Sequence, residues 1–206
     1  MSQKNEMRMV NEADVASEKS GGSKRIRSGK RAEPQLRALT LNVRSARRAD
    51  KRAELGKFLE TQKAQIVVLT ETWLNFMVNQ IGEFAVHQSP PSEHQGVAIL
   101  TGPGVQNVTP VLPSAWTSTL VAVSVQCGLS QAYVVASYAP PHKQKDAQDE
   151  LLAFLAHLHV RARNPAILAM GDWNIGVDEA CQLAAKGKLQ LAQPDAAPLQ
   201  THCRGN

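Results

Sequence analysis

Cysteine is scarce in this chain, and its few copies exclude a disulfide framework. Three cysteines occur among 206 residues, and they stand far apart in the sequence. An odd number without tight spacing argues against a disulfide-stapled secreted domain and is typical of a reducing compartment. Cys203 stands beside His202, but no second Cys/His pair at zinc-finger spacing accompanies it, which disfavours a zinc site.

Long apolar runs are missing as well. The first residues are polar and charged, so they lack the apolar segment of a secretory signal. No stretch approaches the roughly 20 apolar residues of a membrane-spanning helix. The chain is nevertheless 43% hydrophobic, which is enough for one domain with a core of its own, and no internal repeat is visible. We therefore expect an intracellular protein without a membrane partner.

Acidic residues are rare between Lys24 and Arg52, where only Glu33 and Asp50 offset a dense series of lysines and arginines. The whole chain carries a formal net charge of +5. A basic stretch of this kind is either a solvated tail or a contact for an anionic partner, and charge alone leaves both interpretations open.

Residues 1–34 also contain few large apolar side chains and are rich in Ser, Gly, Lys, Arg and Glu. Such a segment cannot bury enough apolar surface to offset the entropy of ordering it. We predict a disordered basic tail over residues 1–34 and one domain over residues 35–206.

Apolar periodicity predicts a mixed α/β domain. Short apolar or alternating runs predict strands, and Leu55, Phe58 and Leu59 are spaced for one face of a helix that begins at Asp50. The predicted strands are residues 36–43, 66–69, 96–100, 121–125, 132–137 and 166–170, and further helices are predicted at 149–161 and 177–185. Because the strands are short and numerous for one open sheet, we expect two packed β-sheets flanked by helices, a four-layer α/β sandwich.

Functional side chains are expected where these strands end. Gly171-Asp172-Trp173-Asn174 directly follows an apolar run, and residues two apart in an extended chain point the same way. Asp172 and Asn174 thus present a carboxylate and an amide together at a sheet rim, which is where open α/β sheets bind ligands.

Three other predicted strands end in the same manner, at Asn42, Glu71 and Tyr138. Singly, each of these residues has an ordinary explanation as a turn residue, a surface charge or a packing side chain. Their coincidence favours one cluster of hard oxygen ligands, which suits Mg²⁺ or Mn²⁺ and the chemistry of phosphate transfer.

Six short motifs together make the chain resemble the endonuclease/exonuclease/phosphatase superfamily, and most of all the apurinic-endonuclease-like domain of non-LTR (LINE-type) retrotransposons. They occur in the family order between residue 36 and the end of the sequence. The motifs are Leu41-Asn42-Val43-Arg44-Ser45, Leu69-Thr70-Glu71-Thr72-Trp73-Leu74, Gly96-Val97-Ala98-Ile99-Leu100, Ser137-Tyr138-Ala139-Pro140-Pro141, Gly171-Asp172-Trp173-Asn174 and Thr201-His202-Cys203-Arg204-Gly205-Asn206.

The resemblance implies a Mg²⁺-dependent (or Mn²⁺-dependent) endonuclease that hydrolyses DNA phosphodiester bonds. Glu71 would be the principal metal ligand, and Asn42 would help to hold the metal or its water shell. Asp172 would activate the attacking water, while Asn174 and Tyr138 would contact the scissile phosphate.

Further expectations follow from the same resemblance. Arg44, His94 and Arg204 are candidate contacts for nucleic acid. The partner would be DNA, the location would be nuclear, and a parent protein would continue into a reverse transcriptase.

The family pattern continues beyond Asn206 with an acid-bearing strand and a Ser-Asp-His element, and none of the six histidines stands in that context. We therefore expect a domain that is incomplete at its C-terminus, with reduced or absent activity and an exposed sheet edge that favours self-association. Two alternatives stay open. One is a non-catalytic relict that at most binds nucleic acid, and the other is a phosphatase or phospholipid phosphodiesterase of the same superfamily.

Overall fold

The computed structural model describes residues 6–7, 36–92, 95–111, 117–127, 130–162 and 165–190. In chain order its elements are β1 (Glu6–Met7), β2 (Ala38–Asn42), α1 (Ala49–Gln62), β3 (Ile66–Thr70), β4 (Gln80–Ile81), β5 (Phe84–Gln88), β6 (Val97–Thr101), β7 (Gln106–Pro110), β8 (Leu120–Cys127), β9 (Ser130–Tyr138), α2 (Gln144–Arg161), β10 (Ala166–Asp172) and α3 (Val177–Lys186).

The strands form two mixed sheets. The six-stranded sheet has the order β1-β2-β3-β6-β5-β4, and the four-stranded sheet has the order β10-β9-β8-β7. Each sheet contains one parallel pair, β2 with β3 in the first and β9 with β10 in the second. A helix connects the two strands of each parallel pair, as a parallel crossover requires.

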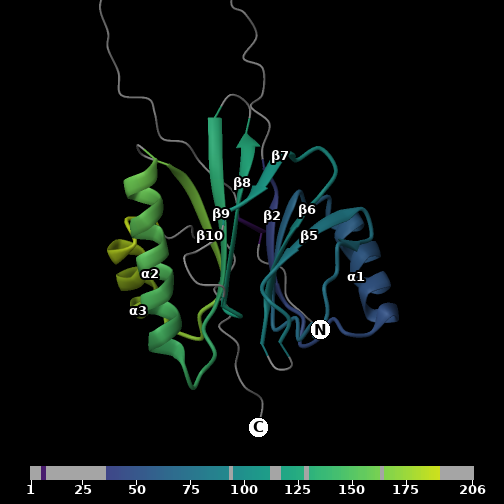
Figure 1. The fold of residues 1–206 in the computed structure, drawn as a ribbon, viewed down its shortest axis with the longest axis horizontal. Coiled ribbons are helices and arrows are strands. Elements are labelled where there is room, and N and C mark those ends of the chain that lie inside the picture. Colours follow the sequence, from purple (N-terminus) through teal and green to yellow (C-terminus); the bar gives the residue numbers. More distant parts are fainter. Residues whose placement is uncertain are drawn as a thin grey trace, which may run out of the picture.

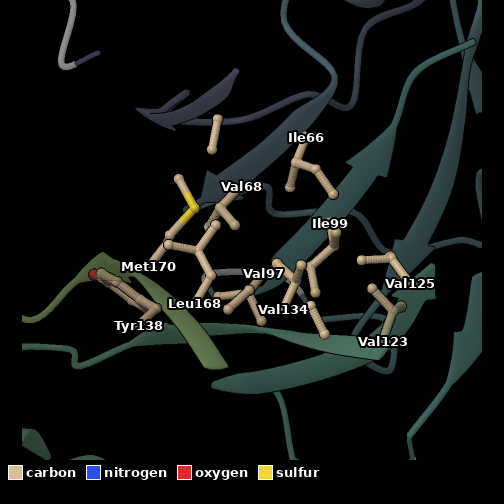
Figure 2. Packing of buried hydrophobic residues seen from close by; sticks show 13 residues of the cluster. Ile66, Val68, Val97, Ile99, Val123, Val125, Val134, Tyr138, Leu168 and Met170 are labelled. Atoms are coloured by element: carbon tan, nitrogen blue, oxygen red, sulfur yellow. The ribbon is translucent and has the colours of Figure 1, made fainter. Parts of the chain in front are cut away.

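The sheets pack face to face, with α1 outside the six-stranded sheet and α2 and α3 outside the four-stranded sheet (Figure 1). A cluster of aliphatic side chains from both sheets fills the space between them (Figure 2). The predicted four-layer α/β sandwich with two packed sheets is therefore confirmed.

Strand β3 shows why this arrangement suits the sequence. Its side chains are all buried, because it has a neighbouring layer on each face. Ile66 and Val68 pack between the sheets, whereas Val67 and Leu69 pack on the side of α1. An unbroken apolar run is what a strand covered on both faces needs.

The elements that the sequence patterns missed lie at a sheet edge, next to one, or in a polar stretch. Strand β7 is an edge strand with exposed polar residues and a proline, so it carries no apolar alternation. Strand β4 has only two residues, and β5 has an irregular burial pattern. Helix α2 begins at Gln144 rather than at residue 149, because its first turns are polar and the apolar stripe starts later.

Two residues of the predicted basic tail, Glu6 and Met7, pair antiparallel with β2. The rest of that tail and the segment after residue 190 lie outside the described residues. Within the described part of the chain, no helix combines the length and apolarity that crossing a membrane requires.

Candidate active site

Strand periodicity brings three of the predicted site residues to one place. Ala38, Ala136 and Met170 belong to the cluster between the sheets. Alternate residues of a strand point to the same face, so Asn42, Tyr138 and Asp172 also face the gap between the sheets. Each of these three is the last residue of its strand, in β2, β9 and β10 respectively.

Asn42 joins the two carboxylates of the site. Its Nδ2 donates one hydrogen bond of 2.8 Å to Glu71 Oε1 and another of 3.1 Å to Asp172 Oδ2. Glu71 follows β3 in the six-stranded sheet, whereas Asp172 ends β10 in the four-stranded sheet. The amide therefore holds one acid from each sheet beside the other.

Tyr138 forms a second link between the sheets. Its hydroxyl donates a 3.3 Å hydrogen bond to the same oxygen, Glu71 Oε1. The side chain is 5% exposed and lies at the margin of the aliphatic cluster, near Met170 (Figure 2). Burial, followed by the charge and hydrogen bond of Glu71 and the charge of Asp172, raises the pKa of Tyr138 to about 12. The phenol is therefore a neutral hydrogen-bond donor at physiological pH.

Asn174 is tied to the loop around Asp172. Its backbone N–H donates to Asp172 Oδ1 at 3.2 Å, and its Nδ2 donates to the carbonyl of Ala139 at 3.0 Å. The Nε2 of Gln144, at the start of α2, donates to the carbonyls of Trp173 and Asn174. The loop that carries the Asp-x-Asn pair is thus fixed by the residue that follows β9 and by the first residue of α2.

Gly171 allows β10 to approach β9 closely. A Cβ on this residue would stand 1.7 Å from the carbonyl oxygen of Ser137, and its φ of +155° is one that other residues rarely adopt. The pairing of Gly171 with Ser137 sets the next pair, Asp172 with Tyr138, in register. A glycine before Asp172 is therefore a geometric requirement of this site.

The loops at the rim contain non-glycine residues in the left-handed region. The φ values are 53° for Glu71, 50° for Trp73 and 51° for Asn174. Such conformations cost of order 1 kcal/mol or more, and they concentrate at functional sites. Backbone bonds hold them in place here, since Ser45 N–H donates to the carbonyl of Glu71 at 2.7 Å and Ala46 N–H to that of Thr72 at 2.7 Å.

The donor set suits a hard cation with few protein ligands. Within the described part of the chain, no three His, Cys, Asp or Glu residues gather as a metal site. The site instead combines two carboxylates with an amide oxygen, which is the kind of partial shell that Mg²⁺ completes with water and phosphate. The hydroxyls of Thr40 and Thr70, on the same face of β2 and β3, are buried and find no partner among the described residues.

The predicted nucleic-acid contacts are only partly described. Arg44 is exposed on the loop after β2, and its N–H donates to Asn42 Oδ1 at 3.2 Å. His94 and Arg204 lie outside the described residues. Sequence reasoning missed the supporting group Gln144, because nothing in the local pattern distinguishes it from an ordinary polar residue.

Known proteins show the same fold. The AP endonuclease from Archaeoglobus fulgidus aligns with a TM-score of 0.54 and 17% identity over 74% of this chain and 70% of that one. The endonuclease domain of TRAS1, a telomere-specific non-LTR retrotransposon, aligns with a TM-score of 0.55 and 18% identity over the same shares. TDP2 from D. rerio, complexed with a single-strand DNA product, gives 0.52 and 13% over 72% and 64%.

No curated protein matches the sequence. The profile of the Endonuclease/Exonuclease/phosphatase family, however, matches residues 39–180, which is well over half of the chain and includes all five residues of the site. The chain therefore belongs to the endonuclease/exonuclease/phosphatase family.

Proposed function

We propose that the chain is a Mg²⁺-dependent endonuclease domain that hydrolyses DNA phosphodiester bonds. The observation that carries the proposal is the junction at Asn42, where one amide holds a carboxylate from each sheet. Two carboxylates kept together at a sheet rim offer anionic oxygen ligands, and such a site suits a divalent ion that also binds a phosphate.

In this proposal, Glu71 and Asn42 hold the ion. When bound, the ion neutralises negative charge that develops on the phosphate and the leaving oxygen. Asp172 orients the attacking water and accepts its proton as general base. The two hydrogen bonds that Asp172 accepts, from Asn42 and from the Asn174 N–H, hold its carboxylate in one orientation.

Tyr138 and Asn174 bind the scissile phosphate. The raised pKa of Tyr138, about 12, supports a role as a proton-bearing donor rather than a base. One hydrogen of the Asn174 amide is committed to the Ala139 carbonyl, which orients the group and leaves its second hydrogen for a phosphate oxygen.

The preference for DNA and for the retrotransposon branch rests on two supports. The loop after β2 and the start of α1 are rich in arginine and lysine, with Arg44 adjoining the site. The similar folds include an AP endonuclease and the endonuclease domain of a non-LTR retrotransposon. A nuclear location, a parent protein that continues into a reverse transcriptase and self-association through a sheet edge belong to the same proposal.

A plasmid-nicking assay with the full chain and Mg²⁺ tests it. Asp172→Ala is expected to abolish nicking, whereas Asp178→Ala, which removes an exposed acid of α3, leaves it unchanged. Nicking that survives Asp172→Ala contradicts the site. Salt-sensitive DNA binding without nicking identifies a non-catalytic relict, and hydrolysis of an inositol phosphate or sphingomyelin but not DNA identifies the phosphatase or phospholipid phosphodiesterase alternative.

A further inference from the structure

A small apolar tip stands exposed in the loop that begins with Glu71 and leads to β4. Phe76 is 41% exposed and Met77 is 59% exposed, in the loop between β3 and β4. Single exposed apolar side chains are common on protein surfaces, whereas adjacent ones form a contiguous apolar surface that indicates a binding contact.

The tip is held rigidly from beneath. Gln88, which is 6% exposed, accepts a 3.0 Å hydrogen bond from the Val78 N–H and donates a 3.0 Å hydrogen bond to the Phe76 carbonyl. One buried amide thereby binds the backbone of the residues before and after Met77. Its placement fixes the backbone that presents the two apolar side chains, so their exposure is built into the fold.

A cation anchors the tip to the rim of the site. The Arg52 guanidinium lies 5.2 Å from the centroid of the Phe76 ring. The same guanidinium donates to the carbonyl of Ala46 at 2.9 Å, and Ala46 N–H donates to the carbonyl of Thr72, the residue after Glu71. Phe76 is five residues from Glu71, so the two Cα atoms are at most about 18 Å apart.

The surface around the tip is positively charged. Arg44, Arg48 and Lys51 are exposed on the loop after β2 and the first turn of α1. Asp50 is the acid of this stretch, and it forms a salt bridge with Arg48. Such a surface complements a nucleic acid. The apolar side chains would contact stacked bases, and the cations would contact the phosphates.

We propose that Phe76 and Met77 form a wedge that inserts into the base stack of duplex DNA while the neighbouring cations hold its phosphates. Apolar wedges of Phe and Met unstack base steps and kink the duplex in other DNA-binding proteins. Here the kink presents the adjacent phosphodiester to Glu71 and Asp172. The proposal rests on the proposed endonuclease function, and its own measurement is binding rather than cleavage.

The test uses the full chain carrying Asp172→Ala and a short duplex with 2-aminopurine at a central step. Phe76→Ala and Met77→Ala are each expected to weaken duplex binding at least about fivefold, in line with the loss of one stacking contact. They should also abolish the rise in 2-aminopurine fluorescence that reports unstacking. Val160→Ala is the matched control, because Val160 is 89% exposed and lies about 24 Å along α2 from the end near the site.

The salt dependence separates the wedge from the cations. Phe76→Ala should leave the slope of log K against log salt unchanged, whereas Arg44→Ala should reduce it by about one unit. Unchanged binding and fluorescence in both tip variants overturn the proposal. It is also overturned if Phe76→Ala converts a dimer into a monomer on a sizing column without affecting DNA binding. Nicking that survives Asp172→Ala would instead remove the proposed endonuclease site and leave the binding result to stand.

Discussion

Asn42 Nδ2 lies 3.1 Å from Asp172 Oδ2, although 130 residues separate the two in the chain. The contact crosses from the six-stranded to the four-stranded sheet, so it exists only when the two sheets are packed. The site and the core between the sheets are therefore one cooperative unit, and mutations in either should affect the other.

Asn42→Ala should lower the free energy of unfolding of the metal-free protein by roughly 2 kcal/mol. The change removes the donor shared by Glu71 and Asp172, and hydrogen bonds to charged groups contribute about 1.5–3 kcal/mol each. Urea unfolding followed by circular dichroism measures the effect. Asn75→Ala, at an exposed loop position, should shift the free energy by less than about 0.5 kcal/mol. Equal effects of the two changes would show that the junction contributes nothing to stability.

Mg²⁺ should raise the melting temperature of the protein, because an ion that binds only the folded state stabilises it by mass action. Glu71→Gln should remove most of this rise, since it replaces the principal carboxylate by a neutral amide. Glu83→Gln changes an exposed acid in the turn between β4 and β5 and should keep the full rise. A thermal-shift titration with MgCl₂ provides the measurement, and an identical rise in all three proteins would refute the assignment of Glu71.

Tyr138 should make the protein lose stability in alkali. Its folded-state pKa is raised to about 12, above the ordinary value near 10, so the folded state holds this proton more tightly than the unfolded state. The stabilisation is complete below about pH 10 and is lost as the pH rises towards 12. Tyr138→Phe should flatten the decline in the free energy of unfolding across this range.

The chain has two tyrosines, so Tyr133→Phe isolates the absorbance of Tyr138. In that background, phenolate absorbance should stay low until well above pH 10 while the protein remains folded. An ordinary titration near pH 10 in folded protein would contradict the contact with Glu71.

Gly171→Ala should destabilise the domain by about 3 kcal/mol or more. The added methyl group would overlap the carbonyl oxygen of Ser137 at 1.7 Å, so the β9–β10 ladder would have to move. Gly176→Ala is a matched control, because a Cβ there meets nothing within 4 Å among the described residues. Gly176 is the N-cap residue of α3, so Gly176→Ala should lower the free energy of unfolding by about 1 kcal/mol or less. Thermal unfolding of both variants, with the nicking rate of Gly171→Ala, checks the expectation.

The parts of the fold that were predictable from the sequence are those with strong local signals. The apolar run of β3 is buried on both faces, and a short unbroken apolar run is typical of such a strand. Residues 166–170 were likewise predictable as a strand, with its polar end projecting from the rim. The convergence of Asn42, Tyr138 and Asp172 followed from the general rule that functional groups gather where strands end.

The unpredicted parts depend on contacts that are distant in sequence. That one amide would bridge Glu71 and Asp172 follows from the packing of the two sheets, which no local pattern of β2 encodes. Strand β7 is an exposed edge strand and shows no apolar alternation. The hydrogen bonds of Gln88 to Val78 and Phe76 were not predictable either, because they join residues that are ten or more apart in sequence. From the sequence alone, a glutamine at the end of a strand near the sheet edge is expected to be a surface residue.

The separation of Asn42 from Asp172 also sets when the site can form during synthesis. At roughly 5–20 residues per second, a ribosome needs on the order of 10 seconds to translate the 130 residues between them. Glu71 is translated 29 residues after Asn42, and for the rest of that interval the nascent chain carries both residues without Asp172, the proposed base. A site built in this order is incomplete until the second sheet has left the ribosome.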